Sequence, residues 1–499
     1  MEANMILEGE ELEGFFKGQI AHLKEEFLAF LSQFDAEDLF HKWREFIRHI
    51  DELYNIASLT SDDEDDMILS CSIDICWTPC YKKVLDVVGN VYGLDVQRRF
   101  NISCLMLSSL NISYAMSGQS RNCCRTLGEA FARCQSMRLY YVDILMLIPC
   151  YAKGSKKVDF IDLLTVFQPM IDQCFVNIRT AYNALIVNEG INDFKASLQD
   201  GAWEFNYNYN HLERDFLEPV RLSLVDVMSN MTDEEKGKLP KFGVHELYGY
   251  EELIEGIELT AAVYNKYGIN ETEKFKEMVE LVHNLKPYLQ DDYAFIVPVD
   301  DYENLRSNYP NLTLHCDSKE FDEMINSRPA FFRFEDKYYS TVLLYQRYMV
   351  NEEQRLMEKN KKFQIDSGFI FEKDIKKDLE DFGYKGTGIK RINHKEYDVV
   401  CIKDNCIYNF QCKNNNVSVS RQGKDWFKRT CDNIRRLNRY YEKALEKENK
   451  REYLLKEKLR IDSVKSYVIS RYPVITRNPR VINYNQLRTW LFMQELISE

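Results

Sequence analysis

Three polar residues in the last quarter of the chain have side chains and spacing suited to phosphate chemistry. Asp398 lies at the start of a run of β-branched and apolar residues, and Gln411 and Lys413 end the next such run. A carboxylate and an amide oxygen can bind a hard divalent cation, which acidifies a bound water and neutralises charge on a phosphate. The ammonium of Lys413 could orient or deprotonate the attacking water, or stabilise charge in the transition state. These residue types predict a metal-dependent hydrolytic site.

The elements that would position these residues form a β-hairpin. Two β-rich runs, Tyr397–Ile402 and Cys406–Lys413, are separated by three residues that predict a tight turn. Side chains alternate along a strand, so Gln411 and Lys413 point to the same face. A hairpin with this short turn returns the chain so that Asp398 lies beside Gln411. The sequence therefore predicts that the three side chains meet at one end of the strand pair.

A helix before the hairpin carries a further carboxylate. Ser367-Gly368 precedes an amphipathic helix at Phe369–Phe382, which Gly383 closes as a C-terminal glycine. Glu372 lies on this helix and could join the site if the helix packs on the sheet. We expect a mixed central sheet flanked by helices. The later elements expected are a helix at Lys424–Lys456, a strand at Ser466–Ser470 and a helix at Gln486–Leu496.

These residues together resemble a known nuclease superfamily. Gly368-Phe369-Ile370-Phe371-Glu372, then Asp398, then Gln411-Cys412-Lys413, are similar to the motifs of the PD-(D/E)xK nucleases. The nearest likeness is to the Mrr-like restriction-endonuclease branch, where Gln-x-Lys commonly replaces Glu-x-Lys. The resemblance covers residues 363–470 and departs from the superfamily at Tyr397, where proline is usual.

The resemblance implies a restriction-endonuclease-like αβββαβ core and a function. In that family pattern Asp398 and Gln411 hold Mg2+ (or Mn2+), Glu372 assists as a metal ligand, and Lys413 is catalytic. The implied activity is that of a Mg2+-dependent endonuclease acting on DNA, as in microbial restriction or anti-phage defence. Two alternatives stay open. One is an RNA nuclease, and the other is a non-catalytic nucleic-acid-binding or interaction protein with a degenerate nuclease fold.

The distribution of charge favours a nucleic-acid partner for the same part of the chain. Residues 361–499 hold 30 Lys and Arg against 19 Asp and Glu, whereas residues 1–360 hold 35 against 60. A basic module on an acidic body is typical of a protein that binds a polyanion locally. The opposite interpretation is that the lysine-rich helices are simply solvated. The basic residues expected to contact the phosphate backbone are Arg421, Lys424, Lys428 and Arg429.

The rest of the chain predicts two further regions. Apolar residues at three- and four-residue spacing predict an all-α region over 1–289. Short β-rich runs at Ala294–Val299 and Ala330–Phe334 predict a small connecting α/β region over 290–360. The third predicted domain is the nuclease-like module at 361–499. The helical region is expected to regulate the module, to form a homo-oligomer or to bind a partner protein.

Several classes of protein are excluded by what the sequence lacks. It has no basic and apolar leader at its start and no apolar run of membrane-spanning length. Fourteen cysteines without a secretion signal indicate reduced thiols in the cytoplasm. The sequence contains no His-Glu-x-x-His pattern, P-loop or dinucleotide fingerprint, so neither a zinc hydrolase nor a nucleotide-dependent enzyme is indicated.

Overall fold

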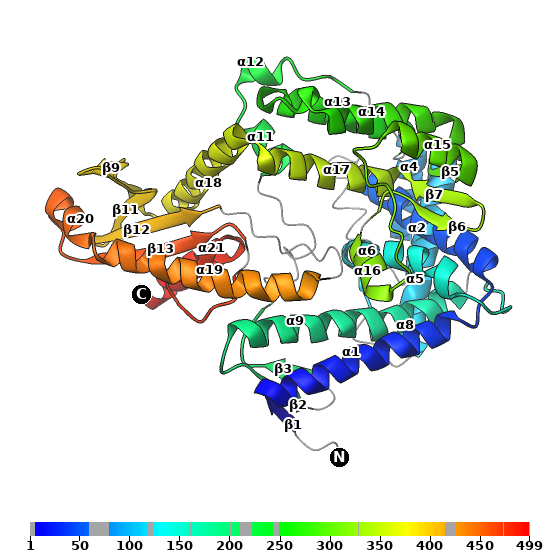
Figure 1. Cartoon of the computed structure of the whole chain (residues 1–499), viewed down its shortest axis with the longest axis horizontal. Coiled ribbons are helices and arrows are strands. Elements are labelled where there is room, and N and C mark those ends of the chain that lie inside the picture. Colours follow the sequence, from blue (N-terminus) through cyan, green and yellow to red (C-terminus); the bar gives the residue numbers. More distant parts are fainter. Residues whose placement is uncertain are drawn as a thin grey trace.

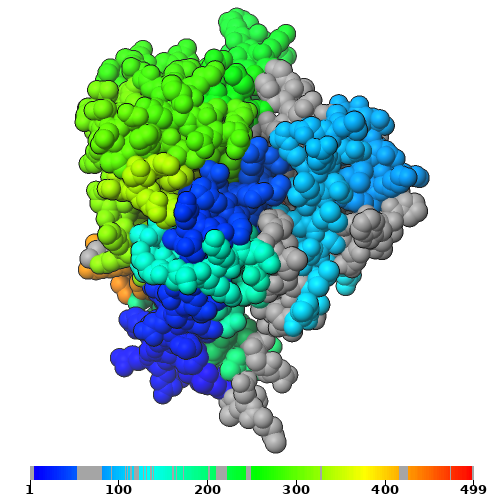
Figure 2. All heavy atoms as spheres, turned by 90° about the vertical axis from the view of Figure 1, so that its right-hand side faces the viewer, coloured from blue at the N-terminus to red at the C-terminus, as the bar shows by residue number. Residues whose placement is uncertain are grey.

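A computed structural model of the chain describes residues 5–58, 79–116, 123–159, 162–199, 202–209, 222–242, 249–327, 329–414, 425–472 and 474–498. Figure 1 shows the sheet of the C-terminal part at one end of the molecule, with α19 (Trp426–Asn449) running alongside α9 (Asn177–Gly190), and α1 (Gly9–Leu31) on the far side of α9. At the other end, which faces the viewer in Figure 2, lie α2 (Ala36–Ser58), α4 (Pro79–Tyr92) and α5 (Leu94–Met116), together with the small sheet that holds β5, β6 and β7. None of the helices in the described ranges is both long and apolar enough to span a membrane.

Helices dominate the chain up to residue 289, as expected. Before α9, the residues from Leu163 to Val176 form a series of α-helical and π-helical turns around Pro169, which cannot donate a backbone hydrogen bond. The helices here are α1 (Gly9–Leu31), α2 (Ala36–Ser58), α4 (Pro79–Tyr92), α5 (Leu94–Met116), α6 (Leu127–Tyr151), η2 (Leu163–Phe167), α8 (Gln168–Ile171), η3 (Asp172–Val176), α9 (Asn177–Gly190), α11 (Leu224–Ser229), α12 (Asp233–Lys236), α13 (Tyr250–Tyr264), η4 (Asn265–Tyr267), η5 (Ile269–Glu271), α14 (Glu273–Leu285) and η6 (Lys286–Tyr288).

The expectation of an all-α region over 1–289 needs one correction, because this region also holds a three-stranded antiparallel sheet. Strand β1 (Met5–Glu8) pairs with β2 (Lys195–Gln199), which pairs with β3 (Ala202–Phe205). The partner of β1 lies far along the chain, so no local pattern reveals the pairing. The β2–β3 hairpin did have a signal, since Asp200-Gly201 separates the two strands in the sequence.

A four-stranded antiparallel sheet follows, in the region where a small α/β unit was expected. Its order is β4-β5-β7-β6, and α17 continues directly from its strand β7. The strands are β4 (Leu289–Gln290), β5 (Ala294–Pro298), β6 (Phe332–Phe334) and β7 (Lys337–Thr341), and the helices are α15 (Val299–Asn308), α16 (Phe321–Ser327) and α17 (Val342–Lys359).

The C-terminal part contains the predicted mixed sheet, with five strands in the order β14-β13-β12-β11-β8. Its central β11–β12 and β12–β13 pairs are antiparallel and parallel, respectively. The strands are β8 (Lys385–Gly386), β11 (Val399–Lys403), β12 (Cys406–Lys413), β13 (Val464–Ser470) and β14 (Val481–Asn483), and a separate pair is formed by β9 (Arg391–Ile392) and β10 (Lys395–Glu396). The helices are α18 (Lys361–Asp381), α19 (Trp426–Asn449), α20 (Glu452–Leu459), η7 (Tyr484–Gln486) and α21 (Leu487–Ser498).

Two helix boundaries differ from the prediction. Helix α18 begins at Lys361, because the Asn360 side chain accepts a hydrogen bond from the Phe363 N–H and caps the helix. Ser367 therefore lies inside α18 rather than at its start. The expected long helix at Lys424–Lys456 is broken after Asn449 into α19 and α20. The predicted C-terminal glycine is confirmed, since Gly383 follows α18 with a φ of 77°.

The apolar cores do not follow the predicted domain boundaries. One core joins residues 27–175 to residues 321–344, and a second extends from 222 to 370. A third joins residues 7–209 to residues 426–481, with α9 packed against α19 and α1 packed against α9. The division at residues 289 and 360 stays a prediction, but each predicted region shares a core with another.

Candidate active site

The β11–β12 hairpin brings the predicted polar residues to one end of the C-terminal sheet. Its register pairs Val399 with Phe410, so Asp398 and Gln411 are neighbours one step further out. The turn at the opposite end holds Asp404 and Asn405 with φ values of 51° and 54°, which is the conformation of a two-residue type I′ turn. The predicted hairpin and its consequence for Asp398 and Gln411 are therefore confirmed.

Hydrogen bonds fix the polar groups at this end. An Oδ2 atom of Asp398 accepts a hydrogen bond of 2.8 Å from the Cys412 N–H, which extends the ladder beyond the last strand pair. Lys413 Nζ donates to Gln411 Oε1 at 3.0 Å, and the Gln411 residue is only 6% exposed. The Lys413 ammonium also lies 5.8 Å from the centre of the Tyr440 ring on α19. These contacts fix an amide oxygen and an ammonium at the same end of the hairpin as the Asp398 carboxylate.

Glu372 lies on α18, which packs on the face of the sheet opposite to the one that α19 covers. The neighbouring Phe371 packs with Phe410 in the core between α18 and the sheet, and Asn414 Nδ2 donates to Ser367 Oγ at 3.2 Å. These contacts anchor α18 against the end of β12. Gln411 and Lys413, by alternation from Phe410, point toward the α19 face. The candidate site therefore straddles the end of the sheet.

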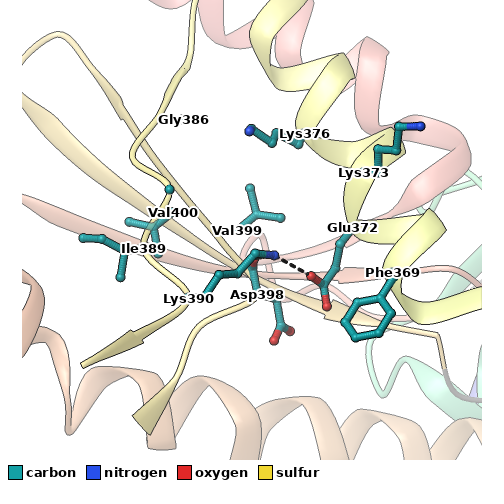
Figure 3. A pocket seen from close by; sticks show the side chains of 11 residues that line it. Phe369, Glu372, Lys373, Lys376, Gly386, Ile389, Lys390, Asp398, Val399 and Val400 are labelled. Atoms are coloured by element: carbon teal, nitrogen blue, oxygen red, sulfur yellow. Dashed lines mark hydrogen bonds and ion pairs between the residues drawn. The ribbon is translucent and has the colours of Figure 1, made fainter. Parts of the chain in front are cut away.

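A hollow of about 220 Å³ connects Glu372 with Asp398. Figure 3 shows Lys390 crossing this hollow to Glu372, with the Asp398 side chain beside it. Lys390 Nζ donates to Glu372 Oε2 at 2.9 Å and to the backbone oxygen of Asp398 at 3.3 Å. The ammonium thus links the helix to the strand that carries the second carboxylate.

The local charges and burial change the acidity of two groups. Burial raises the pKa of Glu372 above its ordinary value, while the ammonium of Lys390 opposes the shift and the Asp398 carboxylate adds to it. Burial also raises the pKa of the Cys412 thiol well above its usual range, and Asp398 and Glu372 contribute. Glu372 therefore gives up its proton less readily than an exposed glutamate, and Cys412 stays a thiol at neutral pH.

Lys390 is the residue near the site that the sequence did not predict. Lys390 lies just before β9, where its backbone oxygen accepts a hydrogen bond of 3.0 Å from the Tyr397 N–H. The β9–β10 pair turns at Asn393 and His394, which both have positive φ. The only signal in the sequence is the turn-forming Asn393, because the flanking residues Arg391, Lys395 and Glu396 are charged and do not predict strands.

The predicted nucleic-acid contacts are only partly within the described chain. Lys428 and Arg429 lie exposed near the start of α19. Arg421 and Lys424 lie outside the described residues. The hollow itself is lined by further cationic side chains, Lys373 and Lys376 of α18, besides Lys390.

The oxygen donors of the site are few. Within the ranges that the structure describes, no group of three or more His, Cys, Asp and Glu side chains is arranged to hold a metal ion. The candidate ligands are instead two carboxylates, Glu372 and Asp398, and the amide oxygen of Gln411. All three are hard oxygen donors, which fit Mg2+ or Mn2+ better than a softer metal ion.

Comparison of the chain with protein-family models, with curated proteins and with solved structures found no match. The resemblance to the nuclease superfamily therefore depends on the motifs and on the geometry described above.

Proposed function

We propose that this protein is a metal-dependent endonuclease that hydrolyses phosphodiester bonds of DNA. The observation that carries the proposal is the end of the β11–β12 hairpin, where Asp398 adjoins Gln411 and Lys413 bonds to the Gln411 amide. Glu372 lines the same hollow as Asp398. A carboxylate, an amide oxygen and an ammonium in this order match the motif on which the resemblance to PD-(D/E)xK nucleases is based.

The donor set fits a magnesium or manganese ion held by Asp398, Gln411 and Glu372. Such an ion would supply Lewis-acid activation of water and neutralise charge on the phosphate. The protein's own groups do the positioning. The Cys412 N–H fixes one oxygen of Asp398, and Lys413 fixes the orientation of the Gln411 amide.

Lys413 is the proposed catalytic cation. Its ammonium lies at the open end of the hairpin, opposite the turn. There it could hold a water or donate to a phosphate oxygen as negative charge develops. The Tyr440 ring, whose centre lies 5.8 Å away, attracts this ammonium through a cation–π interaction. Lys390 contributes a second positive charge on the Glu372 side of the site.

The proposed partner is DNA, and its contacts would be electrostatic. The surplus of basic residues over 361–499, the exposed Lys428 and Arg429, and the lysines of the hollow all favour a phosphate backbone. We propose the cytoplasm as the site of action because of the cysteine content.

The test is cleavage of supercoiled plasmid by the full chain in the presence of Mg2+ or Mn2+. We expect nicking or linearisation that is lost in Asp398→Asn and in Lys413→Met. Asp404→Asn is the matched control, because Asp404 lies at the other end of the same hairpin in a turn that asparagine accepts. Cleavage that persists in both site variants would exclude the proposed site.

A second candidate is a nucleic-acid-binding protein without catalysis. The observation that favours it is the ammonium of Lys390, which already neutralises Glu372. Binding of labelled DNA or RNA without cleavage at any Mg2+ or Mn2+ concentration would select this candidate. Cleavage of RNA and not of plasmid would select the RNA nuclease.

A further inference from the structure

One aromatic residue that lines the hollow beside Glu372 has no part in the proposed hydrolysis. Phe369 lies one turn before Glu372 on α18 and is 64% exposed. The side of α18 that packs on the sheet is formed by other apolar residues, Phe371, Ile375 and Leu379, which are almost completely buried. The Phe369 ring is therefore not needed to hold the helix on the sheet, and it faces solvent at the edge of the hollow.

Much of the remaining lining of the hollow is apolar or lacks a side chain. Val399 of β11 and Ile389 contribute apolar surface, and Gly386 contributes only backbone. Figure 3 shows the Phe369 ring on one side of the hollow, with Gly386 and Ile389 across from it. A Cβ atom at Gly386 would lie 2.9 Å from Lys376 Cε, so the missing side chain keeps space open beside α18.

Charge alone does not identify the ligand of this hollow. Two of its three lysines are paired with carboxylates, Lys390 with Glu372 at 2.9 Å and Lys376 with Glu380 at 3.6 Å. The distinguishing feature is an exposed aromatic ring and apolar side chains beside a few polar groups. Such a lining suits a flat ring with apolar faces and polar edges, as in a nucleobase.

We propose that the hollow accepts an unpaired base of the nucleic-acid substrate, stacked on Phe369. The proposal rests on the proposed function, since Asp398 lines the same hollow and every phosphodiester that it helps to hydrolyse joins two nucleosides. In a duplex each base is stacked on its neighbours, so its face becomes available to a side chain only after unstacking. The substrate is therefore single-stranded DNA, or DNA with locally unpaired bases. Stacking tolerates every base, because each has a π-face.

The experiment is the binding of a fluorescein-labelled single-stranded oligonucleotide, and of its duplex, to the full chain. Fluorescence anisotropy in EDTA measures affinity without metal-dependent cleavage. We expect Phe369→Ala to bind the single strand about 5- to 150-fold more weakly, which is the effect of one lost base–aromatic stack. The duplex should show the smaller change. Phe369→Trp, which keeps an aromatic face, should retain single-strand affinity.

The matched control is Phe492→Ala on α21. Phe492 is 54% exposed but does not line the hollow, so its removal should leave single-strand affinity unchanged. The proposal is overturned if the unchanged protein does not bind the single strand, or if Phe369→Ala binds it with unchanged affinity.

Plasmid cleavage by the unchanged protein with Mg2+ or Mn2+ separates this proposal from the nuclease assignment. Cleavage together with unchanged single-strand affinity in Phe369→Ala would remove the base site and leave the nuclease. Weaker single-strand binding in Phe369→Ala without any cleavage by the unchanged protein would keep the base site and remove the catalysis.

Discussion

At the scale of single residues, the ion pair of Lys390 with Glu372 is the contact that most directly affects the protonation of the candidate site. The carboxylate is half-buried on α18, and its ion pair with Lys390 has a length of 2.9 Å. Burial and the nearby Asp398 favour the protonated form, whereas Lys390 favours the charged form. The net raised pKa means that the folded protein binds this proton more tightly than the unfolded chain does. Glu372 therefore lowers the free energy of unfolding as pH rises between its ordinary pKa and its raised one.

The first prediction concerns this pair. Lys390→Met removes the group that opposes the shift, so the pKa of Glu372 should rise further. Carboxyl-carbon NMR titration of the metal-free protein measures that pKa directly. Lys376→Met, which removes another lysine of the same hollow without touching the Glu372 ion pair, should leave it almost unchanged. An unchanged Glu372 pKa in Lys390→Met would contradict the geometry described.

The second prediction concerns a buried ion pair beneath β12. Glu448 is 0% exposed and Arg451 is 6% exposed, and Arg451 Nε donates to Glu448 Oε2 at 2.7 Å. Asn409 Nδ2 of β12 donates to the same oxygen at 2.7 Å. Glu448→Gln leaves the arginine charged and buried without its counterion, and should cost about 3 to 5 kcal/mol in urea-induced unfolding. Glu446→Gln, an exposed neighbour on the same helix, should change stability by less than about 0.5 kcal/mol.

At the scale of elements, the β11–β12 hairpin is the unit that creates the candidate site. Its turn is short and both turn residues have positive φ. Asn405→Gly should therefore be neutral or slightly stabilising, whereas Asn405→Val should cost about 1 kcal/mol or more because a β-branched residue resists this conformation. Urea unfolding of the two variants measures the difference. Equal stability of both would show that residue 405 does not adopt the left-handed conformation.

The same hairpin shows what a sequence can predict. Its turn, its register and the meeting of Asp398 with Gln411 follow from residues within a short stretch of chain. The position of Lys390 depends on the turn between β9 and β10, which the sequence did not reveal. The pairing of β1 with β2 joins strands that lie far apart in the sequence. Local patterns contain no information on such distant pairings, which are decided by the packing of the whole core.

At the scale of the whole molecule, the third core ties the N-terminal helices to the C-terminal sheet. Trp426, Ile434, Leu437 and Leu445 of α19 are buried against a set of apolar residues from α1, α9 and the 471–481 segment. Gly190 marks the closeness of this contact, since a Cβ atom there would lie 3.1 Å from Ile434 Cγ2. The packing of residues 361–499 therefore depends on the first 200 residues.

This packing predicts the behaviour of a fragment. Residues 361–499 expressed alone should expose the apolar side of α19, bind a hydrophobic dye strongly and aggregate at concentrations where the full chain stays monodisperse. Co-expression with residues 1–360 should restore a soluble complex. Dye fluorescence and size-exclusion chromatography measure both outcomes, and a fragment that is folded, monomeric and dye-free would show that the shared core is dispensable.

The shared core also has a consequence for the order in which the chain folds during synthesis. Helix α9 leaves the ribosome more than two hundred residues before α19, which covers it. Because synthesis adds about 5 to 20 residues per second, the side of α9 that packs against α19 stays uncovered for about ten seconds or more. Chaperones that bind nascent chains are expected to protect this surface. The candidate site, built from residues that emerge just before α19, would complete its surroundings only when synthesis is almost finished.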